Sequence, residues 1–218
     1  MHIPDGYLSP ATCVTAYAVA VPLWAVGFKK VRERLDERSL PLLASLTALS
    51  FVIMMFNIPI PGGTSGHAVG AALLAILFGP WIAFVAVSLA LLIQALLFGD
   101  GGITTFAANA LDMAAAGSFV AWWTFQALRR YRYAPFLAGW LGLVAASFLA
   151  SIFLGIQPHI AVDAAGKALY FPFGLTTTIT ALTGAHLLFF GVVEGIFTQL
   201  GYAFLKKTDP ELFAEEAR

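Results

Sequence analysis

The first two residues of the chain have the chemistry of a metal chelate. Met1 supplies a chain-terminal amine, and His2 supplies a backbone amide nitrogen and the ring nitrogen Nδ1. The amine and the amide close a five-membered ring on one ion, and the amide and Nδ1 close a six-membered ring. Three nitrogens in one plane suit Ni(II) or Cu(II), because only a strongly polarising metal displaces an amide proton. Taken alone the motif is weak, and the alternative is that His2 is an ordinary polar residue on an exposed tail.

His67 is the candidate for a fourth nitrogen. It follows the polar, glycine-rich loop 57–66 and begins the short apolar segment 67–79. We expect this loop and the tail 1–10 to lie on the same, outer face of a membrane. An ionisable side chain at the mouth of a span is a functional candidate. The alternative is that Ser65 caps a helix and His67 is incidental.

Two acidic residues, Asp112 and Glu194, fall inside apolar segments. A charge at the centre of a membrane helix costs roughly 2.5–3.5 kcal/mol, so each should face the bundle interior and have a partner. For Glu194 we favour hydrogen bonding between helices, whereas Asp112 shares a helix face with Asn109 and could equally orient metal ligands. We expect His159 to be solvated in an outer loop. The residues expected to support the ligands are Asp5, Ser65, Asp100, Asn109 and Asp112.

Two rival functions remain open. Residues 63–66 read Gly-Thr-Ser-Gly, which fits the nucleophile motif of rhomboid-like intramembrane proteases, with Ser65 as nucleophile and His186 as base. Against it, the histidine and asparagine expected for an oxyanion hole are missing from the earlier spans. The other rival is a stand-alone secondary metal carrier. That function needs a polar path, and beyond Asp112, His186 and Glu194 the interior is expected to be dry.

The composition requires these residues to be positioned by membrane helices. Of 218 residues, 60% are apolar and only 11% are charged, far from the balance of a soluble domain. This excludes an ordinary cytosolic enzyme and a disordered chain, and the zero net charge argues against nucleic acid as a partner. One cysteine, Cys13, excludes a disulfide framework and a cysteine-based metal cluster.

Seven apolar segments predict seven transmembrane helices in one all-α domain, residues 1–218. They are 11–28, 40–58, 67–79, 80–98, 103–128, 134–156 and 175–205.

Eleven of the twelve basic residues fall into three groups, at 29–38, at 129–132, and at Lys206, Lys207 and Arg218. Basic groups mark the cytoplasmic side, so an even number of crossings must separate the first two. Segment 67–79 must therefore cross, although thirteen helical residues reach only about 20 Å, and so it should lie either where the bilayer is thinned or inside the protein. The N-terminus is then outside and the C-terminus cytoplasmic. The alternative, a re-entrant hairpin, gives six spans.

Residues 1–10, Met-His-Ile-Pro-Asp-Gly-Tyr-Leu-Ser-Pro, closely resemble the start of the CbiM/NikM family. Further matches are the run 61–67, the run 98–102 together with Asn109, and the segment from His186 to Glu194. The resemblance covers nearly the whole chain. Members of this family are nickel/cobalt substrate-binding (S) components of energy-coupling factor (ECF) transporters.

The resemblance implies a transport protein of a bacterial or archaeal cell membrane, not an enzyme, with no organic cofactor. It implies Met1, His2 and His67 as metal ligands, and one helix before the usual six of S components. The implied partners are a transmembrane scaffold (T) subunit, which would meet the small residues Ala44 and Ala48, a pair of cytoplasmic ATPases and a possible small membrane accessory subunit. The square-planar geometry favours nickel over cobalt as the transported ion.

Overall fold

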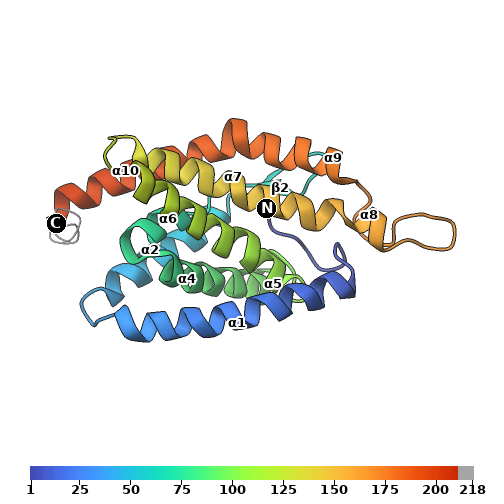
Figure 1. Ribbon diagram of the computed structural model, residues 1–218, viewed down its shortest axis with the longest axis horizontal. Coiled ribbons are helices and arrows are strands. Elements are labelled where there is room, and N and C mark those ends of the chain that lie inside the picture. The colour runs from blue at the N-terminus through green and yellow to red at the C-terminus, as the bar shows by residue number, and fades with distance from the viewer. Residues whose placement is uncertain (211–218) are drawn as a thin grey trace.

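The computed structural model describes residues 1–210, which form a bundle of apolar helices (Figure 1). The seven longer α-helices are α1 (Pro10–Arg34), α2 (Leu40–Met54), α3 (Ala71–Phe78), α4 (Pro80–Ile93), α6 (Gly117–Leu128), α7 (Ala134–Gly155) and α10 (Gly191–Thr208). Shorter α-helical pieces are α5 (Phe106–Asn109), α8 (Gln157–Ile160) and α9 (Leu175–Thr178). Four π-helical segments continue these helices: η1 (Gln94–Phe98), η2 (Ala110–Ala116), η3 (Ile179–Thr183) and η4 (His186–Phe190).

Several of the helical runs have the length and composition of membrane spans. Four are long and apolar enough, namely Pro10–Arg34, Pro80–Phe98, Ala134–Ile160 and Leu175–Thr208. Helix α2 is apolar but shorter, and it ends at Met54, not at the predicted residue 58. The run predicted from 103 becomes helical at Phe106, where α5, η2 and α6 follow one another. These runs confirm a helical membrane protein of several spans.

The third predicted span differs from a simple helix. Only α3 is helical, and eight residues extend about 12 Å. Residues 67–70 before it are not helical, and they are buried. Residues 71–76 are buried as well, because α3 packs against α4, α6 and α7. Of the two predicted alternatives, the structure supports burial inside the protein, and the prediction that the segment is helical from residue 67 is wrong.

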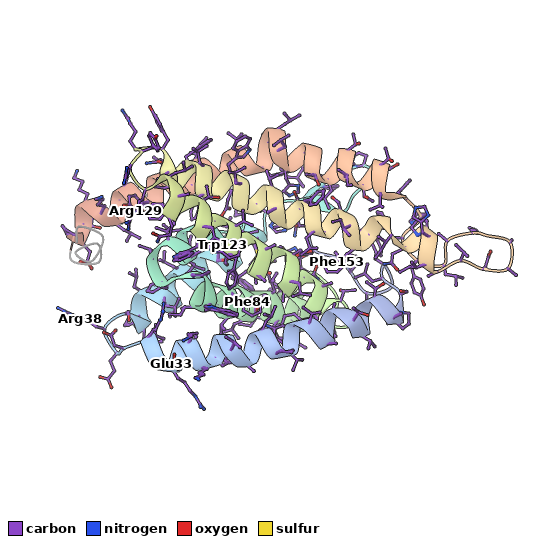
Figure 2. All side chains as sticks on the ribbon, viewed as in Figure 1. Glu33, Arg38, Phe84, Trp123, Arg129 and Phe153 are labelled. Carbon is purple, nitrogen blue, oxygen red and sulfur yellow. The ribbon has the colours of Figure 1, made fainter. Side chains whose placement is uncertain are left out.

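The basic residues gather at one end of the bundle. Figure 2 shows Arg38, after α1, and Arg129, after α6, at the end where α10 also finishes. The turn between α3 and α4 lies there too, because a Cβ on Gly79 would come within 3.8 Å of Arg34 Nη1. Segment 67–79 therefore ends at the basic end of the molecule. The remaining basic residue of the third group, Arg218, lies outside the described residues.

A two-stranded antiparallel hairpin interrupts the bundle between α2 and α3. Strand β1 (Ile58–Pro59) pairs with β2 (Ser65–Gly66), with Ile58 opposite Gly66 and Pro59 opposite Ser65. Gly66 passes so close to the ring of Phe190 that any Cβ at this position would overlap it. The hairpin thus carries the glycine-rich loop into contact with η4, directly before His67.

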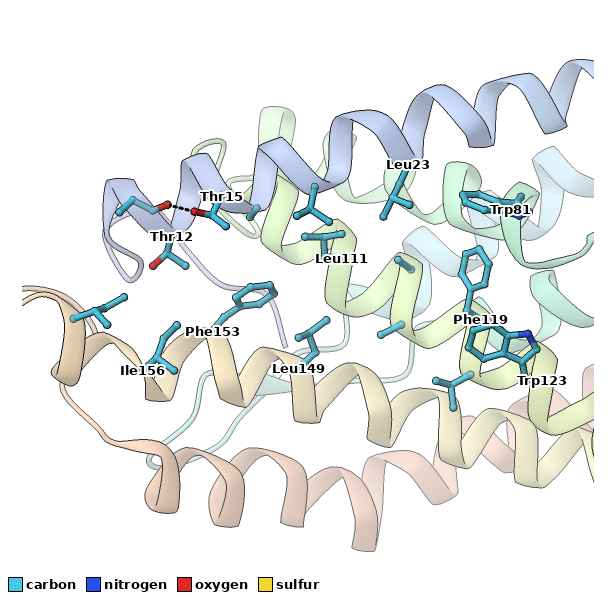
Figure 3. A pocket seen from close by; sticks show the side chains of 17 residues that line it. Thr12, Thr15, Leu23, Trp81, Leu111, Phe119, Trp123, Leu149, Phe153 and Ile156 are labelled. Carbon is cyan, nitrogen blue, oxygen red and sulfur yellow. Dashed lines mark hydrogen bonds between the residues drawn. The ribbon is translucent and has the colours of Figure 1, made fainter.

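An apolar cavity of about 730 Å³ separates α1 from α6 and α7 (Figure 3). Its walls include Leu23, Phe119 and Phe153, and the hydroxyls of Thr12 and Thr15 lie at one end. All of its lining residues are described, and none is a His, Cys, Asp or Glu. The metal chemistry of this chain must therefore lie elsewhere.

Candidate metal centre

The N-terminal tail is inserted into the protein, not left on its outer surface. Met1 and Ile3 are 0% exposed and His2 is 4% exposed. In Figure 1 the N-terminus lies among the helices, near β2. The interpretation of His2 as an ordinary residue on an exposed tail is therefore wrong. Burying a chain terminus and a histidine requires polar partners, and the tail has several.

Asn109 holds the tail at Ile3 with both ends of its side-chain amide. The Ile3 amide nitrogen donates to Asn109 Oδ1 over 2.8 Å, and Asn109 Nδ2 donates to the Ile3 carbonyl over 3.0 Å. The Gly102 amide nitrogen donates to the same carbonyl over 3.1 Å. Residue 102 must be glycine for this approach, because any Cβ there would overlap Asp5.

Hydrogen bonds at Asp5 and Ser9 fix the rest of the tail. The Asp5 carboxylate accepts from the amide nitrogens of Ile103 and Thr104 over 3.1 and 2.8 Å. These hydrogen bonds lower the pKa of Asp5 against the opposing effect of burial, which is the largest single cause acting on it. The Ser9 amide nitrogen donates to Gln157 Oε1 over 2.9 Å. Asp5 is thus an anchor of the tail.

The amine of Met1 lies against the hairpin. It donates to the carbonyl of Ser65 and lies 3.1 Å from Ser65 Oγ. Ser65 Oγ in turn donates to Asn57 Oδ1 over 2.9 Å. Because Ser65 lies in β2, the alternative in which it caps a helix is wrong. Burial lowers the pKa of the Met1 amine from 8.0 to about 5, with the nearby charges of Asp112 and Asp100 opposing the shift. The amine is therefore neutral near pH 7 and has a lone pair to give.

The two predicted histidine ligands lie face to face. The rings of His2 and His67 stack with centroids 4.7 Å apart and planes 25° apart. Within residues 1–210, neither His2 Nδ1 nor His67 Nε2 has a hydrogen-bond partner. Burial, and then the neighbouring amine, lower the pKa of His2 to about 3. Buried ring nitrogens without a partner are rare in native proteins, and a transported ion would satisfy both.

The charges of two carboxylates, Asp100 and Asp112, act on the Met1 amine. Asp100 Oδ1 lies 3.3 Å from His2 Nδ1, and Asp100 Oδ2 accepts from Asn57 Nδ2 over 2.7 Å. Burial raises the pKa of Asp100, and the bond from Asn57 opposes this. Asp112 is fully buried, and its Oδ2 has no hydrogen-bond partner in the part of the chain that the structure describes. Asp100 therefore lies beside His2, and the role of both carboxylates in supporting the ligands stays a prediction.

Glu194 holds the segment that follows His67. Its Oε2 accepts from the Val69 amide nitrogen over 2.7 Å, and its Oε1 accepts from the Gly70 amide nitrogen over 2.9 Å. The Val69 carbonyl accepts from Ser50 Oγ over 2.6 Å. Glu194 was predicted to hydrogen-bond between helices; it bonds instead to the non-helical residues that precede α3. An extended stretch between helices is tolerated inside a membrane protein because its backbone groups find such partners.

The geometry gives no support to a serine protease. Ser65 Oγ bonds Asn57 and faces Met1, whereas His186 Nδ1 bonds the carbonyl of Leu182 over 2.7 Å. No hydrogen bond joins Ser65 to His186 among the described residues. His186 Nε2 is buried without a hydrogen-bond partner in residues 1–210, and no role is assigned to it.

Sequence reasoning missed two buried glutamines. Gln94 Oε1 lies 3.1 Å from His2 Nε2, and Gln157 anchors Ser9. Both amides are 0% exposed. The available signal in the sequence is a neutral amide near the end of a long apolar segment.

Side chains alone do not make this site. Among residues 1–210, no group of three or more His, Cys, Asp or Glu side chains is close enough to hold an ion. Two histidines can complete a site only if backbone nitrogens contribute. The amine and the His2 amide are the nitrogens at hand, so the geometry fits the chelate predicted from residues 1 and 2.

Comparisons with known proteins agree on a transport family. Residues 2–212 match the model of the family CbiM, described as the cobalt uptake substrate-specific transmembrane region. The chain is 47% identical to the fused nickel transport protein NikMN of Rhodobacter capsulatus over 98% of its own length, and it spans only 64% of that relative. It is 40% identical to a putative metal transport protein of Methanocaldococcus jannaschii, covering 99% of this chain and 96% of that one. A crystal structure of a truncated transition metal transporter superposes with a TM-score of 0.93 at 44% identity, covering 95% of this chain and 99% of that one.

Proposed function

This chain belongs to the CbiM family, and on that premise we propose that it captures Ni(II), or Co(II), at the outer face of the membrane for ATP-driven uptake by associated subunits. The observation that carries the proposal is a buried Met1 amine whose charge acts on two buried histidines, His2 and His67, with their rings stacked at a centroid distance of 4.7 Å. In the proposed site the amine and the two rings supply three nitrogens, and the His2 amide supplies the fourth. Four nitrogens including a deprotonated amide suit planar Ni(II) better than Co(II).

The other subunits and the energy source are proposed from the resemblance to ECF transporters. We infer that a T subunit, a pair of cytoplasmic ATPases and a small accessory membrane subunit complete the assembly. Seven crossings would leave the basic groups in the cytoplasm and the tail outside. Support for this orientation comes from the gathering of Arg34, Arg38 and Arg129 at one end of the bundle.

A one-residue extension tests the function at its centre. Placing an alanine before Met1 turns the amine into a peptide nitrogen and lengthens a fully buried tail, while every side chain is kept. We expect Ni(II) binding to the purified protein to be lost. The matched control is an alanine added after Arg218, which should leave binding unchanged. An extended protein that binds Ni(II) as tightly as the control would refute the proposed site.

A further inference from the structure

We propose that Gln94 sets the tautomer of His2: it holds the ring proton on Nε2 and leaves the lone pair of Nδ1 free for the ion. This inference rests on the proposed function, because it matters only if His2 Nδ1 is a ligand. A neutral imidazole carries its proton on one nitrogen and can bind a metal only through the other. The chelate with the amine and amide requires Nδ1, so the proton must sit on Nε2.

The position of Gln94 follows from the end of helix α2. The last four carbonyls of an α-helix lack partners within that helix, and Phe51 is the first of these four in α2. The Gln94 side-chain nitrogen Nε2 donates to the Phe51 carbonyl over 3.2 Å. Turning the amide over would set its oxygen against the carbonyl oxygen of Phe51. The helix end therefore fixes which way the amide of Gln94 points.

With its nitrogen committed to Phe51, Gln94 presents its oxygen to His2. Gln94 Oε1 lies 3.1 Å from His2 Nε2, and an amide oxygen can only accept a hydrogen bond. His2 Nε2 must therefore carry the proton. Gln94 is 0% exposed, so no bulk water competes for either bond. A carbonyl or carboxylate that fixes the far nitrogen of a metal-binding histidine is a recurring arrangement in metal sites.

Asp100 is the competing acceptor. Its Oδ1 lies 3.3 Å from His2 Nδ1, on the side where the ion would bind. If His2 lost its contact with Gln94, the proton would move to Nδ1 and face this carboxylate. The ring would then offer no lone pair to the chelate. Gln94 thus determines whether Nδ1 of His2 has a free lone pair for the ion or carries the ring proton.

The start of a π-helix places Gln94 at this point. Helix α4 ends at Ile93, and η1 runs from Gln94 to Phe98. A π-helical turn accommodates an extra residue and rotates the side chains that follow, and such turns are frequent at functional sites. The same turn ends before Asp100, whose amide nitrogen donates to the Gln94 carbonyl over 3.2 Å. One short segment therefore carries both groups that compete for the proton of His2.

The experiment reads the tautomer directly, without metal. In full-length protein labelled with ¹⁵N-histidine, the His2 signals are assigned by their loss in His2→Ala, and the chemical shifts report which nitrogen is protonated. We expect Nε2–H in the wild type, a move to Nδ1–H in Gln94→Met, and retention of Nε2–H in Gln94→Glu, whose carboxylate still accepts. Gln157→Met is the matched control, because it removes another fully buried amide that anchors the tail at Ser9 but does not touch His2.

Nickel titration of the same proteins completes the test. We expect Gln94→Met to weaken Ni(II) binding by about 10- to 100-fold, the usual cost of losing a partner of a metal-binding histidine. Gln94→Glu should bind within a few-fold of the wild type. Nδ1–H in the wild type, or unchanged Nε2–H in Gln94→Met, would overturn the inference. A tautomer that follows Gln94 in a wild-type protein that binds no Ni(II) would instead refute the proposed function and leave the assignment of the proton standing.

Discussion

At the scale of single residues, the site depends on keeping an amine and an imidazole uncharged. The Met1 amine has its pKa lowered by burial from 8.0 to about 5, and His2 has its pKa lowered from 6.5 to about 3. A group with a lowered pKa binds its proton more weakly when buried than when exposed. Insertion of the tail is therefore most favourable above pH 8, and it weakens as the pH falls from 8 toward 5.

Because the Met1 amine and His2 are neutral in the inserted tail, we expect Ni(II) binding to release fewer protons than the reference pKa values indicate. From the reference pKa values alone, a site of one amine, one amide and two imidazoles would release more than one proton per Ni(II) at pH 7. In the inserted tail the amine and His2 are already neutral, so only the His2 amide gives up a proton. We expect a release of about one proton at pH 7, measured by calorimetry in buffers of different ionisation enthalpy. The affinity should then fall about tenfold per pH unit between pH 8 and 6.

The proton count also discriminates between models. A release near zero would exclude the amide as a ligand and move the ion to carboxylates such as Asp100 and Asp112. A release near two would mean that the metal-free tail is solvated, with its amine protonated until Ni(II) arrives.

Substitutions at Ser65 and His67 distinguish a residue that binds the ion from a residue that only lies beside the site. His67→Ala removes the fourth nitrogen, and we expect it to abolish tight Ni(II) binding. Ser65→Ala removes a hydroxyl that bonds Asn57 and faces Met1, but it keeps the backbone carbonyl that accepts from the amine. It should cost about 1 kcal/mol, roughly a fivefold loss of affinity. Isothermal titration with Ni(II) measures both, and a silent His67→Ala variant beside an inactive Ser65→Ala variant would contradict this assignment.

At the scale of elements, the segment between β2 and α3 positions His67. Its backbone is clamped by Ser50 and by Glu194, which come from α2 and α10. Hydropathy predicted an apolar segment here and predicted its burial. It could not predict the extended residues 67–70, because their conformation depends on a carboxylate more than a hundred residues away.

Glu194→Gln tests whether the hydrogen bonds from Glu194 to residues 69 and 70 position His67. The glutamine keeps one acceptor oxygen but directs an NH2 group at a backbone N–H, so one of the two bonds is lost. We expect a loss of about 1–3 kcal/mol in stability, seen as a lower thermal unfolding temperature, together with weaker Ni(II) binding. The control is Thr198→Val, one turn further along α10, whose buried hydroxyl has no hydrogen-bond partner within residues 1–210. Equal behaviour of the two variants would show that Glu194 does not position His67.

The parts of the site that could be predicted are those that neighbours in sequence define. Met1 and His2 are adjacent, so their chelate follows from bond geometry alone. The burial of the tail could not be predicted, because it depends on Asn109, Gly102 and Gln157, which the fold brings to residues 3–9. Gln94 was missed for the same reason, since its role is visible only once Phe51 and His2 lie on either side of it.

At the scale of the whole molecule, the two ends of the helix bundle differ in their charged residues. Arg38 and Arg129 lie at one end, and the loop 161–174 extends from α8 at the other (Figures 1 and 2). By the positive-inside rule, we propose that the basic end faces the cytoplasm. On this orientation the nitrogens of the tail are reached from outside, and the turn at Gly79 faces the cytoplasm.

Cysteine labelling checks the orientation. In a Cys13→Ala background, an impermeant thiol reagent added to intact cells should label a cysteine at the exposed position Ala165. It should not label cysteines at Arg34 or Arg130, which are equally exposed in the structure. These two should react only after the membrane is opened. Labelling at Arg130 in intact cells would mean that segment 67–79 does not cross, and the bundle would have six spans.

The magnetic state of bound nickel tests the central claim most directly. The proposed site, with four nitrogens in one plane from Met1, His2 and His67, would impose a low-spin Ni(II) ion, which is diamagnetic and yellow. We therefore expect the purified protein, loaded with one equivalent of Ni(II), to show the absorption band of planar nickel and no paramagnetism. A paramagnetic ion with the weak bands of six-coordinate nickel would place carboxylate oxygens or water around the metal and contradict the account.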